Sequence, residues 1–199
     1  MRVLIADDEA VIRMGLRTML EDKGHQVVAA ATDGASAIQM MRTERPEVIL
    51  LDIKMPGMDG LEAARKIMQE RPTPVVMLTA FSQRELVNEA HEASVFGYLV
   101  KPVKEDLLDA TLDLAVTRFK EWQKLQKQVQ DLNKSLVARE VVEKAKRLLM
   151  DQQDLTEQQA FNKIHRTSRS RRVTMQQVAQ EILDRGEKEP KTKKGGGKV

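Results

Sequence analysis

The stretch VILLDIKMPGMDG, residues 48–60, decides the fold, because an apolar run ends there on a single carboxylate. The run leads directly into Asp52, and the chain then turns through Pro56 and Gly57. A continuous apolar run, unlike an alternating one, is typical of a strand buried on both faces of a parallel sheet. Asp52 is therefore expected at the end of a buried strand. A carboxylate is unusual at such a position unless it has a chemical role.

Four more apolar runs are separated by segments with helical periodicity. They are Val3–Ala6, Val27–Ala30, Val75–Leu78 and Tyr98–Val100. Two intervening helices are expected to begin with capping-box spacing, at Asp59 with Glu62 and at Ser82 with Glu85. Parallel strands need crossover helices, so five such units predict an α/β fold with a parallel sheet and helices on both faces.

The composition fits a soluble globular protein with a strongly charged helical part, at 199 residues, 41% hydrophobic and 32% charged. There are no cysteines, which excludes disulfides and thiolate-bound metal sites, and three scattered histidines argue against a histidine metal site. No apolar run approaches the roughly 20 residues of a membrane span, and acids at positions 7–9 argue against a signal peptide. We therefore expect a cytoplasmic protein with no membrane partner.

The two parts of the chain carry opposite charge. Residues 1–118 hold 14 Lys and Arg against 19 Asp and Glu, a net charge of −5. Residues 119–199 hold 19 Lys and Arg against 11 Asp and Glu, a net charge of +8. This asymmetry indicates different partners for the two parts, with a polyanion as a candidate for the basic part.

A long helix is predicted from about Lys104 to about Gln152, a stretch without proline or glycine. Apolar residues recur in it at alternating spacings of four and three, the pattern of a coiled-coil seam over about three heptads. The seam comprises Ala115 and the predicted dimerisation residues Trp122, Leu125, Val129, Leu132 and Leu136. A helix of about 45 residues is roughly 68 Å long, so pairing with another chain is favoured over packing on its own domain. Residues 119–138 are the predicted coiled-coil linker.

Two further helices are expected after the long one. Their predicted starts, at Thr156 with Gln159 and at Thr174 with Gln177, both have capping-box spacing. Each carries an apolar stripe, which includes Phe161 in the first helix, and together with the end of the long helix they suffice for a three-helix bundle over residues 139–185. Residues 186–199, GEKEPKTKKGGGKV, are predicted to be a disordered basic tail.

Polar residues stand at the carboxyl ends of four of the five predicted strands. They are Asp7, Asp8, Asp52, Thr79 and Lys101. Ligands of open parallel sheets bind at these ends, and three carboxylates in one crevice are tolerable when a hard cation such as Mg²⁺ lies among them. Taken singly, each residue has a simpler explanation: the acids as helix caps, Thr79 as a turn residue and Lys101 as a surface charge. Their joint placement favours a site.

This arrangement predicts phosphoryl chemistry. An aspartate is a competent nucleophile towards an activated phosphorus, which would make Asp52 an aspartyl phosphate. A cation and a lysine would neutralise the transferring group, with positioning supplying the remaining catalysis.

The segments LIADDEAVIRMGL, LLDIKMPGMDGLEA, VVMLTAF and GYLVKPV resemble the receiver domain of two-component response regulators, over residues 1–118. The resemblance implies a flavodoxin-like (βα)5 fold, phosphorylation of Asp52 by a sensor histidine kinase, and no enzymatic activity beyond the receiver's own phosphorylation and dephosphorylation. It places the magnesium ligands at Asp8, Asp52 and the backbone carbonyl of Lys54, with Asp7 in the outer acidic pocket. It also implies that Thr79 and Lys101 contact the phosphoryl group, that Tyr98 is the switch aromatic, and that the Lys101–Pro102 bond is cis.

The basic part contains HRTSRSRR, residues 165–172, whose guanidinium and hydroxyl groups suit phosphate oxygens. The predicted RNA-binding residues are Lys144, Lys146, Arg147, Arg166, Arg169, Arg171 and Arg172. Aromatic content is 3%, so recognition of a structured hairpin is favoured over stacking-led binding of single strands. A solvated basic surface is the simpler alternative, and a DNA-reading helix at residues 175–183 is disfavoured because it has no Lys or Arg.

Residues 139–183 resemble the ANTAR domain of transcription antitermination regulators, notably at Ala145-Lys146, Ala160-Phe161 and Val178-Ala179. The family usually has glycine where this chain has Arg147, and often methionine near the position of Arg169. Together, the receiver and ANTAR resemblances imply an antiterminator that uses Mg²⁺ in its receiver, is controlled by phosphorylation of Asp52, and binds RNA stem-loops as a homodimer whose formation phosphorylation promotes. A signalling adaptor whose coiled coil and bundle bind another protein is the alternative of a different class.

Overall fold

The computed structural model describes residues 1–80 and 95–186. These residues form two compact units, the first spanning Met1–Lys124 and the second beginning at Leu125. The helix predicted to start at Ser82 and the predicted tail beyond residue 186 lie outside the described residues.

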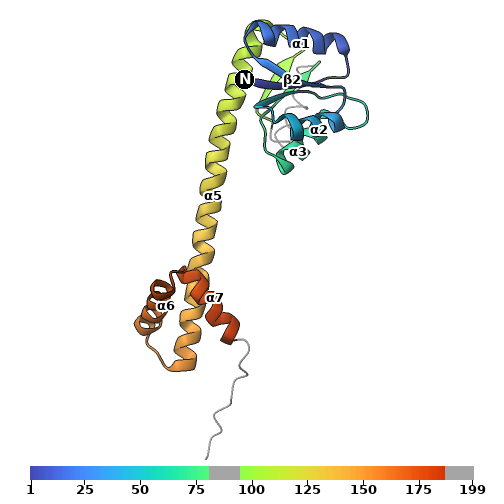
Figure 1. The fold of residues 1–199 in the computed structure, drawn as a ribbon. Helices are drawn as coiled ribbons and strands as arrows, with labels where there is room; N and C mark the ends of the chain where they lie inside the picture. The colour runs from blue at the N-terminus through green and yellow to red at the C-terminus, as the bar shows by residue number, and fades with distance from the viewer. Residues whose placement is uncertain (81–94, 187–199) are drawn as a thin grey trace, which may run out of the picture. The chain divides into compact units, whose positions relative to one another are not determined.

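The first unit is built on a five-stranded parallel sheet with the strand order β2-β1-β3-β4-β5 (Figure 1). Its strands are β1 (Arg2–Ala6), β2 (Gln26–Ala31), β3 (Val48–Asp52), β4 (Val75–Thr79) and β5 (Gly97–Val100). The strands β3 and β4 are buried at every position, as their continuous apolar runs predict. The predicted α/β fold with a parallel sheet is confirmed.

Helices cover both faces of this sheet and complete two hydrophobic cores. They are α1 (Ala10–Asp22), α2 (Gly34–Glu44), α3 (Gly60–Glu70) and the first part of α5 (Glu105–Gln153). One core packs the sheet against α2 and α3, and the other packs it against α1 and α5 (Figure 1). The predicted start of α3 is confirmed, because the Asp59 side chain accepts a hydrogen bond from the backbone N–H of Glu62.

The long helix α5 is continuous, but its first part belongs to the core of the first unit. Ala115 is fully buried there, beside Leu112. Trp122 stacks on Phe119 at a centroid separation of 5.7 Å and meets the edge of Phe96 at 6.1 Å. Ala115 therefore belongs to this core and not to an open seam, whereas the role of Trp122 in dimerisation stays a prediction. Their intramolecular packing also carries the first unit past the predicted boundary at residue 118.

Beyond Trp122 the predicted seam is open to solvent. Leu125, Val129, Leu132 and Leu136 are all more than half exposed, at 52–65%. They follow one another at spacings of four, three and four, so they form one apolar row on α5. No helix in the described part of the chain is both long and apolar enough to cross a membrane.

The second unit is a three-helix bundle of the end of α5 with α6 (Glu157–Arg171) and α7 (Met175–Gly186). Both predicted capping boxes are present: Thr156 and Gln159 exchange hydrogen bonds at the start of α6, as do Thr174 and Gln177 at the start of α7. The bundle core contains Ala145, Leu149, Ala160, Ile164, Val178 and Ala179, as the apolar stripes predict.

Candidate functional site: an acidic pocket and a basic helix face

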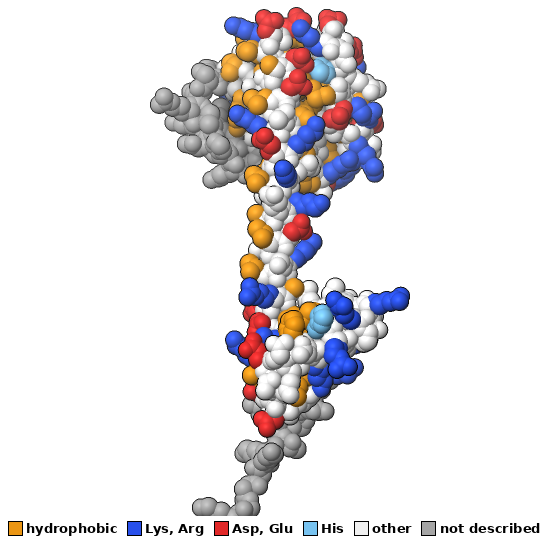
Figure 2. Space-filling model, turned by 90° about the vertical axis from the view of Figure 1, so that its left-hand side faces the viewer, with side chains coloured by type: hydrophobic (Ala, Val, Ile, Leu, Met, Phe, Trp, Pro, Cys, Tyr) orange, Lys and Arg blue, Asp and Glu red, His pale blue; other side chains and the backbone are white. Residues whose placement is uncertain are grey.

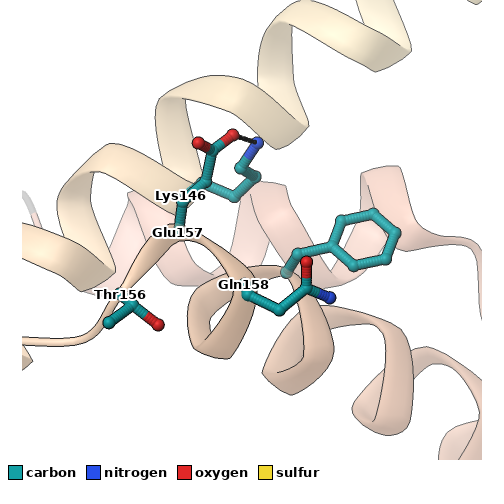
Figure 3. A pocket seen from close by; sticks show the side chains of 5 residues that line it. Lys146, Thr156, Glu157 and Gln158 are labelled. Carbon is teal, nitrogen blue, oxygen red and sulfur yellow. Dashed lines mark hydrogen bonds and ion pairs between the residues drawn. The ribbon is translucent and has the colours of Figure 1, made fainter.

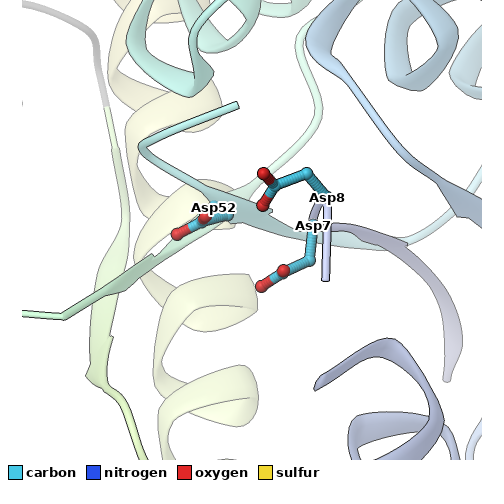
Figure 4. Close-up of side chains that lie close together, drawn as sticks. All are labelled: Asp7, Asp8 and Asp52. Atoms are coloured by element: carbon cyan, nitrogen blue, oxygen red, sulfur yellow. The ribbon is translucent and has the colours of Figure 1, made fainter. Parts of the chain in front are cut away.

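Three carboxylates converge at the carboxyl edge of the sheet (Figure 4). Asp7, Asp8 and Asp52 each offer an oxygen, and these oxygens lie within 4.8 Å of one another. Strand pairing explains the convergence, because Ala6 at the end of β1 is in register with Leu51 of β3. The strands β1 and β3 are neighbours although β2 lies between them in the chain, so the acids mark the point where the strand order switches.

Lys101 compensates part of this negative charge from the end of β5. Its Nζ lies 2.7 Å from Asp7 Oδ2 and 3.2 Å from Asp52 Oδ1. Asp7 is completely buried, and within the described residues its Oδ2 accepts no hydrogen bond of normal geometry despite this ion pair. Three acids against one buried ammonium leave the pocket short of positive charge.

The pKa values follow from the burial of these groups. Burial raises the pKa of Asp52, and the negative charge of Asp7 adds to the rise, while Lys101 opposes both. Burial lowers the pKa of Lys101, but its ion pairs with the carboxylates of Asp7 and Asp52 outweigh that effect and leave the pKa raised. Lys101 is therefore a fixed positive charge at neutral pH.

The donor set fits a magnesium ion. Carboxylate and carbonyl oxygens are the ligands that Mg²⁺ prefers, and the poorly satisfied oxygen of buried Asp7 calls for further positive charge. The pocket is of the kind that binds Mg²⁺ in receiver domains. An adjoining hollow of about 580 Å³, lined in part by Asp8 and Lys54, opens the site to solvent.

The other residues predicted for this site flank the pocket. Thr79 is buried at the end of β4, and its carbonyl accepts a hydrogen bond from the N–H of Lys101 at 2.8 Å. Tyr98 is half-buried on β5, and this burial raises the pKa of its hydroxyl. The Lys101–Pro102 bond is cis, as the resemblance implies.

Two residues that sequence reasoning missed hold the pocket in place. Arg13 on α1 donates to the backbone carbonyls of Asp7 at 2.7 Å and Asp8 at 2.9 Å. Gly60, the first residue of α3, lies so close to the backbone of Asp52 that a Cβ on it would be 2.0 Å from the carbonyl oxygen of Asp52. The DG pair after Pro56 and Gly57 was a sequence signal for this close approach, since glycine lets two backbone segments meet.

In the second unit, several predicted RNA-binding side chains are exposed. Figure 2 shows Lys and Arg side chains gathered on one side of this unit. The exposed residues are Lys144, Arg147, Arg166, Arg169, Arg171 and Arg172. Two of them have carboxylate partners: Lys144 lies 2.8 Å from Glu140, and Arg171 makes two hydrogen bonds to Glu181, of 2.5 and 2.9 Å.

Lys146 does not lie with the exposed group, contrary to expectation. Its side chain is only 8% exposed, and its Nζ lies 3.0 Å from Glu143. The Nζ also lies 2.7 Å from Glu157, a pair that Figure 3 shows. The hydrogen bond to Glu157, followed by that to Glu143, raises the pKa of Lys146. Lys146 thus links α5 to α6, and we exclude it from the candidate RNA surface.

Phe161 also differs from expectation. Sequence periodicity places it in the bundle core, but its side chain is 38% exposed. Its ring stacks on His165 with the planes 7° apart and the centroids 6.0 Å apart. The second unit therefore exposes an aromatic side chain, contrary to the expectation that Phe161 lies in the core.

The chain belongs to the response regulators that carry an ANTAR domain. Residues 3–113 match the response regulator receiver domain family, and residues 130–183 match the ANTAR domain family. A receiver implies a phosphodonor kinase, and an ANTAR domain implies RNA binding. The chain is therefore a regulator rather than an enzyme.

A relative of similar length is the transcriptional regulatory protein PdtaR of Mycobacterium tuberculosis, 44% identical over 183 residues, which cover 92% of this chain and 89% of PdtaR. Solved receivers resemble the first unit. They include the chemotaxis protein CheY4 of Vibrio cholerae, with TM-score 0.54 and 31% identity over 57% of this chain and 97% of that one. The receiver domain of the response regulator NarL of M. tuberculosis gives TM-score 0.54 and 35% identity over 57% and 94%. The chain is thus a PdtaR-like transcriptional regulator.

Proposed function

We propose that this protein is an antiterminator in which phosphorylation of Asp52 promotes dimerisation and thereby binding of RNA stem-loops. The observation that carries the proposal is the presence, in one chain, of a pocket built around Asp52 and a separate bundle with exposed arginines. The acidic charge of the first part and the basic charge of the second match these two tasks.

In the phosphorylation step, an Oδ atom of Asp52 attacks the phosphorus of a phosphohistidine on the donor kinase. The P–N bond breaks, the imidazole leaves with its electron pair and takes up a proton, and an acyl phosphate forms. Asp8, Asp52 and the carbonyl of Lys54 would hold Mg²⁺, which would supply positive charge for the phosphoryl oxygens. Lys101 is already within 3.2 Å of Asp52 and contributes the second positive charge.

The phosphoryl group then promotes pairing of α5, the helix that runs through both units. Thr79 and Tyr98 respond to the phosphoryl group and reshape the surface of the first unit, and the apolar row Leu125, Val129, Leu132 and Leu136 pairs with the same row of a second copy. Each leucine buried in this way contributes about 1.5–3 kcal/mol. Pairing gives two basic bundles, which suits a target with two neighbouring stem-loops and raises the effective concentration of the second contact.

On the RNA side, the exposed arginines bind phosphate oxygens. Arg166, Arg169 and Arg172 lie on or directly after α6, and an arginine fork donates two parallel hydrogen bonds to a phosphate. Binding that depends on such contacts weakens steeply with added salt, because bound phosphates release their counterions.

A gel shift of the full-length protein, with and without acetyl phosphate and Mg²⁺, tests the proposal on tandem stem-loop RNA and on matched duplex DNA. We expect the phosphodonor to tighten binding to the RNA and to leave the weak binding to DNA unchanged. The Asp52→Asn variant is the control, and it should bind the RNA equally with and without phosphodonor. RNA binding that is equal for phosphorylated and unphosphorylated wild-type protein would contradict the coupling.

The exposed apolar row also favours a second candidate, a signalling adaptor whose helix α5 binds another protein. Glu140 and Glu181 already pair with two of the predicted RNA-binding residues, which reduces the free positive charge of the bundle. The same gel shift distinguishes the two candidates, because an adaptor should ignore RNA at every salt concentration.

A further inference from the structure

The α6 face that carries the exposed arginines also carries an aromatic stack. Phe161 and His165 are four residues apart, and their rings lie parallel, 7° from coplanar. Arg169 follows His165 by four more residues, so all three project from one side of the helix. In Figure 2, blue Lys and Arg side chains on the second unit lie beside a pale-blue histidine and an orange hydrophobic side chain. The spacing thus places the aromatic pair and Arg169 on the same side of α6.

An open pocket of about 580 Å³ lies directly beside the phenyl ring. It is lined by Phe161 together with Lys146, Thr156, Glu157 and Gln158. Figure 3 shows the amide of Gln158 on α6, next to the one aromatic ring among the lining residues.

Two polar groups of this pocket have partners within the second unit. Lys146 pairs with Glu157 at 2.7 Å, although the Glu157 side chain is 70% exposed, and the Gln158 amide donates to Asn162 Oδ1 at 3.3 Å. The capping box of Thr156 and Gln159 fixes the backbone from which Glu157 and Gln158 project. A carboxylate accepts hydrogen bonds, while an amide both donates and accepts them, so the wall can pair with the mixed edge of a planar heterocycle.

We propose that the Phe161–His165 stack and the adjoining pocket bind one unpaired nucleobase from the loop of an RNA stem-loop. This inference rests on the proposed RNA-binding function and assigns it a base-binding site. The base stacks on the exposed ring of Phe161, its edge meets Glu157 and Gln158, and the flanking phosphates meet Arg169 and Arg172. Double-stranded RNA keeps its bases stacked inside the helix, so only a loop or bulge can supply such a base.

The chemistry favours a nucleobase over a peptide side chain. A flat pair of parallel rings offers a planar surface, and base–aromatic stacking tolerates any base because every base has a π-face. The nearby exposed arginines suit a partner with regularly placed negative charges, which a phosphate backbone supplies on both sides of the bound base.

Two substitutions at the ring isolate its contribution. Phe161→Leu keeps an apolar side chain but removes the aromatic face, whereas Phe161→Tyr keeps the face. The probes are stem-loop RNAs selected for binding to the wild-type full-length protein from a pool with a randomised loop, and a blunt duplex of the same stem sequence. Affinities for both RNAs are measured by fluorescence anisotropy on phosphorylated protein.

We expect Phe161→Leu to weaken stem-loop binding by roughly tenfold, the usual effect of losing one stacked base, with binding to the blunt duplex unchanged. Phe161→Tyr should bind both RNAs like the wild type. A leucine variant that binds the stem-loop normally would overturn the base site while leaving RNA binding intact, and the stack would then serve another class of ligand. Failure of the wild-type protein to bind any stem-loop would overturn the proposed function itself.

A second measurement needs no variant that alters packing. The selected RNA carries 2-aminopurine at each loop position in turn, and its emission is recorded with the wild-type protein. At the position bound by Phe161 the emission should stay quenched by stacking, while other loop positions brighten as the loop opens. Brightening at every loop position would overturn the proposal.

Discussion

The acidic pocket and the basic face of α6 are built on opposite principles. In the pocket, side chains from three strand ends meet within a few ångströms, and Asp7 and Asp52 are 0% and 6% exposed. On α6 and at its end the arginines are exposed and lie on about two turns of helix, at positions 166–172. A buried cluster depends on every member because an unpaired charge there is costly, whereas exposed charges act almost independently. One substitution should therefore abolish the first site, and several should be needed to abolish the second.

The largest expected effect comes from the nucleophile itself. Asp52→Asn removes the oxygen that forms the acyl phosphate, so we expect intact-protein mass spectrometry to detect no phosphoryl adduct after incubation with acetyl phosphate and Mg²⁺. Asp59→Asn is a matched control in the same loop, because asparagine caps a helix about as well as aspartate. An adduct on Asp52→Asn comparable to wild type would mean that the pocket does not supply the phosphoacceptor.

The next largest effect is expected from Gly60→Ala, a substitution that tests how tightly the pocket is packed. Gly60→Ala would bring a Cβ to 2.0 Å from the carbonyl oxygen of Asp52, so that α3 or the loop after β3 must move. We expect the free energy of unfolding of the first unit to fall by about 3 kcal/mol and the phosphorylation rate to fall with it, as measured by urea denaturation and mass spectrometry.

Gly15→Ala is the companion to this variant. Gly15 lies within α1, and a Cβ there meets nothing within 4 Å. Relief of the glycine entropy cost should raise the free energy of unfolding by about 0.5–1 kcal/mol. If both alanine variants destabilised the protein equally, the close packing of α3 on Asp52 would not be what constrains this loop.

A third effect concerns the apolar row on α5. Leu132→Gln should weaken dimerisation of the phosphorylated protein by about 100-fold or more, because each of the two copies loses a leucine contact of about 1.5–3 kcal/mol. Sedimentation equilibrium would measure this change. Lys134→Gln introduces the same side chain on the opposite side of the helix and should leave the dimer intact. Equal dimerisation of wild type and Leu132→Gln would point to a different contact surface.

The two sites also differ in how far the sequence predicts them. The acids of the pocket follow apolar runs directly, and parallel strands end at one edge, so local pattern alone brings Asp7, Asp8 and Asp52 together. The close approach of Gly60 and the backbone contacts of Arg13 depend on how helices pack on the sheet. No periodicity in the sequence encodes such contacts.

In the bundle, the sequence predicts the helices and their caps better than the surface. Helical periodicity separates an inner from an outer face but does not assign a residue at the boundary, so Phe161 was placed in the core although it is 38% exposed. Lys146 looked like a surface charge because its partner Glu157 is on another helix, at a distance of 2.7 Å that only the tertiary structure reveals. The contact of Trp122 with Phe96 was missed for a similar reason, since the two residues are remote in sequence.

The smallest expected effect comes from comparing two positive side chains of the bundle. Arg169 is proposed to bind RNA, whereas Lys146 stabilises the bundle. Arg169→Gln should weaken stem-loop binding modestly and reduce the slope of log affinity against log salt by about 1, since one phosphate contact is lost. Lys146→Met should leave that slope unchanged, because its ammonium is held by Glu143 and Glu157 rather than by RNA. Its effect should instead appear as a lower melting temperature of the bundle by circular dichroism. A reduced salt slope for Lys146→Met would show that this lysine exchanges its carboxylates for a phosphate, and the basic surface would then extend into the pocket beside Phe161.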